Sequence, residues 1–190
     1  HEAIGFRLTT ISPADDPRRA DMDGPEPIRL ERSADASPAV GRAGMVYRDL
    51  IPGRLGGAVI ASHISIPEGG LVPDYVHHHD IRFQMIFCHA GWVKVVYEDQ
   101  GDPFVMWPGD CVIQPPGIRH RVLESSDGLE VVEIGAPAEH DTHREHELEL
   151  PNGAGNPDRA WQGQRFLRHE YADDRWTGSP EAGWELQHFG

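Results

Sequence analysis

Between residues 45 and 135 the chain is a succession of short apolar runs separated by turns, and this pattern limits the fold more than any other feature. The runs are rich in Val, Ile, Phe and Tyr, which are enriched in β-strands. In order they are MVYRDLI, GAVIASHISI, FQMIFCHAGWVKVVYED, PFVMW, CVIQ, HRVLESS and LEVVEIG. Glycine- and proline-containing turns such as PEGG, PGD and SSDG divide them. Many short strands at close spacing predict an antiparallel sandwich or barrel.

The two ends of the chain lack this pattern. Residues 1–43 are rich in Pro, Asp, Arg and Ala, which predicts an irregular N-terminal extension. The barrel is expected over residues 44–137. Residues 138–190 begin with a polar, His- and Glu-rich run and end with several tryptophans, which predicts a C-terminal extension. The sequence leaves three alternatives open for that extension. It could pack on the barrel as a tail, exchange with a partner subunit, or begin a second barrel that is cut short.

Composition excludes several classes of partner. The formal net charge is −14, and binding to nucleic acid or to an anionic membrane surface needs a basic footprint instead. No apolar run approaches the roughly 20 residues of a membrane span. The two cysteines form no CxxC motif, and the first residues lack the pattern of a secretory signal. We therefore expect a cytoplasmic protein without bound nucleic acid or a membrane anchor.

Three consecutive histidines precede one of the apolar runs, and strand geometry separates them. Alternate side chains of a strand share a face, so His77 and His79 point together and His78 points away. A second segment, GDCVIQPPGIRH, ends with His120 after a Pro/Gly turn. Two antiparallel strands would bring His120 opposite the first pair. Imidazole groups gathered in this way suit zinc, copper, iron and nickel, and an added oxygen ligand extends the range to manganese.

These two segments resemble the two conserved motifs of the cupin superfamily, which consists of small jelly-roll β-barrels with a metal ion inside. The resemblance covers residues 56–135 and implies an all-β, cupin-type jelly-roll barrel. Carried over residue by residue, it implies metal ligation by His77, His79, Gln84 and His120. It further implies one divalent transition metal ion, which is iron, manganese, nickel, copper or zinc, a small-molecule substrate, and a homodimer.

Two residues depart from the cupin pattern. Gln84 stands where the family usually has Glu, and a neutral amide ligand leaves more positive charge on the metal ion. An amide also cannot act as a general base. Glu124 stands where the second motif often has Asn, and by strand alternation it shares the face of His120 and Val122. The sequence therefore predicts Glu124 as the catalytic acid or base.

Each of these predictions competes with a simpler interpretation. The clustered histidines would then be surface residues, Gln84 a polar core residue bonded to backbone, and Glu124 an ordinary rim carboxylate. His78 is expected to face solvent. A second group of histidines lies three residues apart in a run that favours a solvated polar segment over a metal-binding helix face, and its members are His140, His143 and His146.

Three functions remain open at the level of sequence. Cupins with three histidine ligands include dioxygenases that cleave carbon–carbon bonds in diketones, flavonols and hydroxyketones, and we place a dioxygenase acting on a small enolisable carbonyl or phenolic substrate first. The alternatives are a non-redox, metal-dependent isomerase, lyase or cyclase, which the neutral Gln84 favours, and a non-catalytic cupin that binds a small ligand.

Overall fold

The structure is a computed structural model that describes residues 37–171, 176–178 and 185–187. One of its sheets has seven strands in the order β1-β2-β3-β11-β6-β9-β15. In that order the strands span Ala39–Val40, Val46–Asp49, Ile60–Ile66, Leu129–Ala136, Phe83–Ala90, Cys111–Ile113 and Leu167–His169. Up to residue 36, the predicted N-terminal extension lies outside the described residues.

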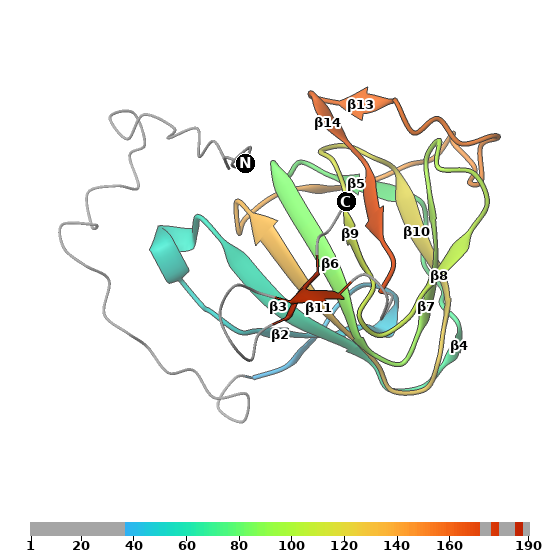
Figure 1. The fold of residues 1–190 in the computed structure, drawn as a ribbon. Coiled ribbons are helices and arrows are strands. Elements are labelled where there is room, and N and C mark those ends of the chain that lie inside the picture. Colours follow the sequence, from blue (N-terminus) through green and yellow to red (C-terminus); the bar gives the residue numbers. More distant parts are fainter. Residues whose placement is uncertain (1–36, 172–175, 179–184, 188–190) are drawn as a thin grey trace, which may run out of the picture.

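A second sheet follows the order β12-β5-β10-β7-β8, with β4 paired to β10. These strands are Thr142–Arg144, His77–His79, His120–Ser125, Val93–Tyr97, Phe104–Met106 and, for β4, Gly70–Leu71. Neighbours in both sheets run antiparallel, and the sheets wrap around a shared interior (Figure 1). The predicted all-β barrel of cupin type is therefore confirmed. Two further hairpins, β13–β14 and β16–β17, span Ala160–Trp161, Gln164–Arg165, Trp176–Gly178 and Glu185–Gln187.

Strand alternation decides which residues fill the interior. Ile64 on β3, Val131 on β11 and Cys88 on β6 lie side by side across three neighbouring strands, and all three are buried. Cys88 thus lies on the inner face, as the parity of its strand predicts. Burial raises the pKa of the Cys88 and Cys111 thiols to about 11, and neither cysteine forms a disulfide. Both are therefore apolar filling at neutral pH.

A tight turn joins β6 to β7, and only glycine fits at its first residue. Gly91 has φ +71°, in the left-handed region that other residues rarely adopt. A Cβ atom there would lie 2.4 Å from Oγ of Ser126, which accepts the backbone N–H of Trp92. This turn fixes the register of two strands that carry lining residues of the interior.

The chain after residue 138 contributes strands to both sheets. β12 pairs with β5, and β15 pairs with β9. Ion pairs hold the intervening segment: Arg159 lies 2.9 Å from Glu98 and also contacts Asp99, and Arg119 lies 2.8 Å from Glu145. In its described part, the predicted C-terminal extension thus packs on the barrel of its own chain. Its boundary at residue 138 stays a prediction.

Helical structure is confined to short 3₁₀ turns, at Arg42–Gly44 and Arg54–Gly57, within the described residues. In that part of the chain, no helix has the length and apolar character needed to cross a bilayer.

The apolar core accounts for much of the stability of the fold. Substitution of Ile118, a core residue that does not line the cavity of the metal centre, tests this contribution. Ile118 is 1% exposed and belongs to the apolar core cluster, so we expect Ile118→Ala to lower the free energy of unfolding by about 2–5 kcal/mol through lost burial and a residual cavity. Leu71→Ala is the matched control, because Leu71 is 86% exposed and should change the value by less than about 0.5 kcal/mol. Urea denaturation measures both. Equal effects would contradict this assignment of the core.

Candidate metal centre

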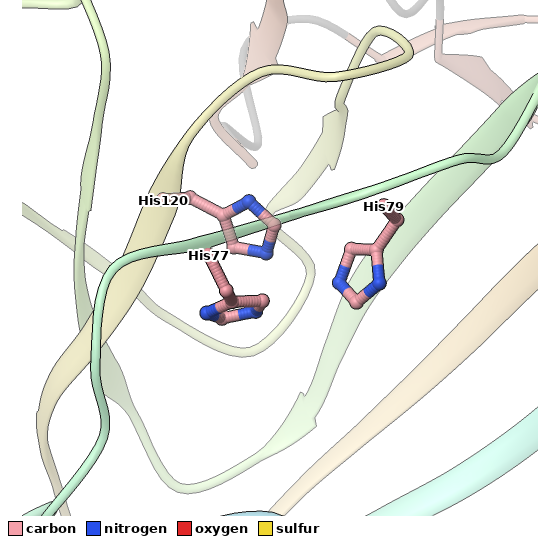
Figure 2. Close-up of side chains that lie close together, drawn as sticks. All are labelled: His77, His79 and His120. Atoms are coloured by element: carbon pink, nitrogen blue, oxygen red, sulfur yellow. The ribbon is translucent and has the colours of Figure 1, made fainter. Parts of the chain in front are cut away.

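Three histidine side chains converge inside the barrel from two paired strands. β10 runs antiparallel to β5 with His120 opposite His77, and His79 lies two residues further along β5. One ring nitrogen from each lies within 4.8 Å of the others. The ring centroids of His77 and His120 are 4.2 Å apart, and those of His79 and His120 are 5.2 Å apart. Figure 2 shows the three rings turned toward a common space.

Backbone carbonyls orient two of these rings. Nδ1 of His77 lies 2.8 Å from the Tyr75 carbonyl oxygen, and Nδ1 of His120 lies 3.1 Å from that of Ile118. A carbonyl only accepts, so each Nδ1 carries the proton and each Nε2 presents a lone pair. Nε2 of His77 is buried and has no hydrogen-bond partner. A buried nitrogen without a partner costs about 1–3 kcal/mol, which a bound metal ion would recover.

The third ring, that of His79, is oriented by a residue outside the two histidine-containing segments. Nδ1 of His79 lies 2.8 Å from the hydroxyl oxygen of Thr142 on β12. A hydroxyl that accepts the Nδ1 proton leaves Nε2 of His79 free, as in the other two rings. The sequence did not single out Thr142, because its partner strand lies more than sixty residues away and β12 carries no apolar pattern.

Electrostatics keep all three imidazoles neutral. Burial, and next the Arg42 cation, lower the pKa of His77 to about 3. Burial and the neighbouring His120 lower that of His79 to about 2, and burial and His77 lower that of His120 well below its ordinary value. Neutral rings with free Nε2 lone pairs are the form that binds metal ions.

Gln84, the predicted fourth ligand, is buried on β6 and belongs to a chain of side-chain amides. Its Oε1 accepts a hydrogen bond of 2.5 Å from Nε2 of Gln114, whose own Oε1 accepts one of 2.9 Å from the hydroxyl of Tyr97. The Gln114 nitrogen also lies 3.5 Å from Nε2 of His120. An amide oxygen has two lone pairs, so the bond from Gln114 leaves one available to a metal ion.

Glu124 lies on the opposite face of β10 from the one that strand alternation predicts. A bulge between Val122 and Glu124 shifts the register of β10 against β7, so Val122 faces Val95 whereas Glu124 faces Lys94. Opposed residues share a face, and Val95 and Val122 line the interior whereas Glu124 and Lys94 are absent from that lining. The structure therefore does not bring Glu124 to the histidines, and its catalytic role stays a prediction without a contact to support it.

The carboxylate that does face the interior is Glu133, which the sequence analysis missed. It belongs to β11, opposite Ile86, and lines a cavity of about 420 Å³ together with His79 and His120. Burial raises its pKa, while the Gln84 side chain and the nearby His140 offset part of that rise. Alternation within LEVVEIG offered a signal, because Glu133 shares the parity of the buried Leu129 and Val131.

The hydroxyl of Thr142 provides a test of the metal centre. We expect Thr142→Val to weaken the binding of one zinc ion by about 10- to 100-fold, because His79 loses the partner that fixes its tautomer and ring orientation. Thr142→Ser keeps a hydroxyl and serves as the control. Competition with a coloured chelator measures the affinity, and wild-type affinity in the valine variant would contradict this role.

Comparisons with known proteins give structural matches only. No family model and no curated protein matches the sequence. A single-residue variant of oxalate decarboxylase from Bacillus subtilis matches with a TM-score of 0.48 and 14% identity, over 59% of this chain and 31% of that one. The same enzyme at pH 4.6 gives a TM-score of 0.48 and 14% identity, over 58% and 30%. The chain thus spans about a third of the length of these proteins.

Similarity at 14% identity transfers neither an activity nor a substrate. The chain's own features are more specific: two antiparallel sheets form a barrel, and three histidines from β5 and β10, two buried and one half-buried, meet inside it. The order of these histidines along the chain is the one that the sequence resemblance implies. On this strand order and this histidine geometry, the protein is a cupin-type β-barrel.

Proposed function

We propose that this protein is a metal-dependent enzyme, and more specifically a dioxygenase acting on a small enolisable carbonyl or phenolic substrate. One observation supports it above all: three neutral imidazoles converge on one point, and two of them, His79 and His120, border the same mostly apolar cavity as the half-buried carboxylate of Glu133. A purely structural role would leave the buried Nε2 of His77 without a hydrogen-bond partner.

The residues present fit a divalent transition metal ion. His77, His79 and His120 would hold it, with Gln84 as the proposed fourth ligand. Three imidazoles suit iron, copper, nickel and zinc, and an amide oxygen extends the range to manganese. When bound, such an ion supplies Lewis acidity and, if it is redox-active, a route for electrons to dioxygen.

The cavity selects a small and mostly apolar substrate. Its walls are aliphatic and aromatic, and its volume of about 420 Å³ lies within the usual range for small-molecule sites. Lining side chains include Ile60, Ile64, Ile86, Val95, Met106 and Val131. Arg42 also lines the cavity, and its Nε lies 3.1 Å from the buried Asp74 carboxylate. A substrate ring or alkyl chain would pack on the apolar walls with its oxygens toward the histidines.

Glu133 is the proposed base. Among the described residues that line the cavity it is the one carboxylate. It would accept the proton from the carbon next to a carbonyl, or from a phenol, and the substrate would remain as an enolate or phenolate. A raised pKa brings the carboxylate closer to the operating pH, which makes it a more effective base.

Non-redox chemistry is the second candidate, and the same carboxylate favours it. An isomerase, lyase or cyclase needs a group that removes a proton and returns it, which Glu133 could do without dioxygen. A ligand set of three imidazoles and an amide is neutral, and it leaves the full charge of the ion to stabilise an enolate. The two candidates share the binding site and the first proton transfer and differ in the fate of the enolate.

Substitution of Glu133 tests the base. We expect Glu133→Gln to lower kcat by about 10²- to 10⁴-fold with unchanged metal content, because the amide cannot accept the proton. In the wild type, kcat/KM should rise with pH as Glu133 ionises, since only the ionised form accepts a proton. Glu130→Gln is the control, because Glu130 lies on the same strand and pairs instead with His63, at 3.1 Å. Full activity in Glu133→Gln would remove the proposed base.

Oxygen consumption separates the candidate functions. With iron-loaded protein and 1,3-diketones or flavonols, we expect uptake of dioxygen in step with substrate loss, and no uptake with His79→Ala. An oxygen electrode and chromatography of the products measure both. Substrate conversion without oxygen uptake would move the assignment to the non-redox class. Binding without conversion of any carbonyl or phenolic substrate would leave the non-catalytic alternative.

A further inference from the structure

We propose that the outer face of β5 and β12 holds a second metal ion, bound by His78, Asp80 and His143. One ligand atom from each of these side chains lies within 4.8 Å of the others, as in the inner group. Two imidazoles and a carboxylate are a ligand set suited to zinc, with water filling the remaining position. The proposal does not depend on the proposed enzymatic function.

The pairing of the two strands creates this group. β12 runs antiparallel to β5 with His143 opposite His78 and Thr142 opposite His79. Since opposed residues share a face, Thr142 and His79 face the cavity while His143 and His78 face outward. Asp80 follows β5 directly, and its backbone N–H donates to the carbonyl of Asp141, at 2.9 Å. The backbone thus fixes all three residues relative to one another.

The donor atoms are close to a metal-binding arrangement. Nε2 of His143 lies 2.8 Å from Oδ2 of Asp80, and the rings of His143 and His78 lie 5.1 Å apart and nearly parallel. Nδ1 of His78 is buried and has no hydrogen-bond partner. Bonds of about 2.0–2.1 Å place tetrahedral ligand atoms about 3.3 Å apart. The separations, all within 4.8 Å, must therefore close by at most about 1.5 Å, which side-chain rotation can supply at a surface.

Solvent and charge favour a cation at this place. The side chains of His143 and Asp80 are 45% and 62% exposed, so an ion reaches them without opening the barrel. The net charge of −14 attracts cations to the surface. The sequence favoured a solvated polar segment here, because the histidines at 78 and 143 are distant in sequence and only strand pairing brings them together.

An ion at this outer group would also act on the inner one. It would join β12 to β5 through side chains, in addition to the strand pairing. Thr142, next to His143, is the residue whose hydroxyl contacts Nδ1 of His79. The outer ion would thereby hold the strand that orients an inner ligand, and we expect tighter binding at the inner group when the outer one is filled.

Counting zinc ions tests the proposal. Metal-free protein is dialysed against zinc, and bound metal is measured by mass spectrometry. We expect two ions in the wild type, one in His143→Asn and in Asp80→Asn, and one in His77→Ala, which removes an inner ligand. His146→Asn is the matched control, because His146 is an exposed histidine two residues after β12 and belongs to neither group, and it should keep two ions.

A second measurement covers any loss of folding in the variants. Zinc should raise the thermal midpoint of His77→Ala and should not raise that of His77→Ala/His143→Asn. The proposal is overturned if His143→Asn and Asp80→Asn bind as many ions as the wild type, or if the second ion disappears in His146→Asn instead. A wild type that binds one ion, lost in His77→Ala, also overturns it while leaving the inner centre intact.

Discussion

The packing of three neutral imidazole rings against one another is the constraint on which the arrangement of the site depends. A charged imidazole would be costly to place there, and the pKa values of His77 and His79, at about 3 and 2, express that cost. Each ring is tolerated because one nitrogen has a fixed partner: a carbonyl for His77 and His120, and the Thr142 hydroxyl for His79. Those partners come from the residues before β5, from the turn before β10 and from β12.

Much of the fold and three of the site residues could be predicted because they depend on local patterns. Alternation placed His77 and His79 on one face, and turn residues marked nearly every barrel strand from residue 46 to 136. Glu124 lies off the face of His120 for a local reason that the pattern hides, since one extra residue in β10 reverses the facing of everything after Val122, and its catalytic role stays a prediction. Glu133 follows simple alternation. It lies two residues after Val131 on β11, so the same rule predicts that its side chain faces the interior.

Long-range pairing explains what the sequence could not supply. Residues 142–144 carry no apolar signal, yet they form a strand, because the edge of β5 offers backbone partners and none of the three side chains has to be buried. The Gln84–Gln114 contact likewise joins residues thirty positions apart through the pairing of β6 with β9. Both features shape the inner centre, and Thr142 lies outside the two motifs that carry the cupin resemblance.

The charge balance of the cavity links metal binding to the proposed base. The ligands are neutral, so a divalent ion brings its whole charge into an interior where Glu133 is the one lining carboxylate among the described residues. Burial alone raises the pKa of that carboxyl, whereas a cation nearby lowers it. Metal loading would therefore shift Glu133 toward its ionised form at neutral pH, and the carboxylate would in turn strengthen metal binding. The proposed base and the proposed metal centre would then be coupled electrostatically, with Glu133 as the counter-charge that a neutral ligand set lacks.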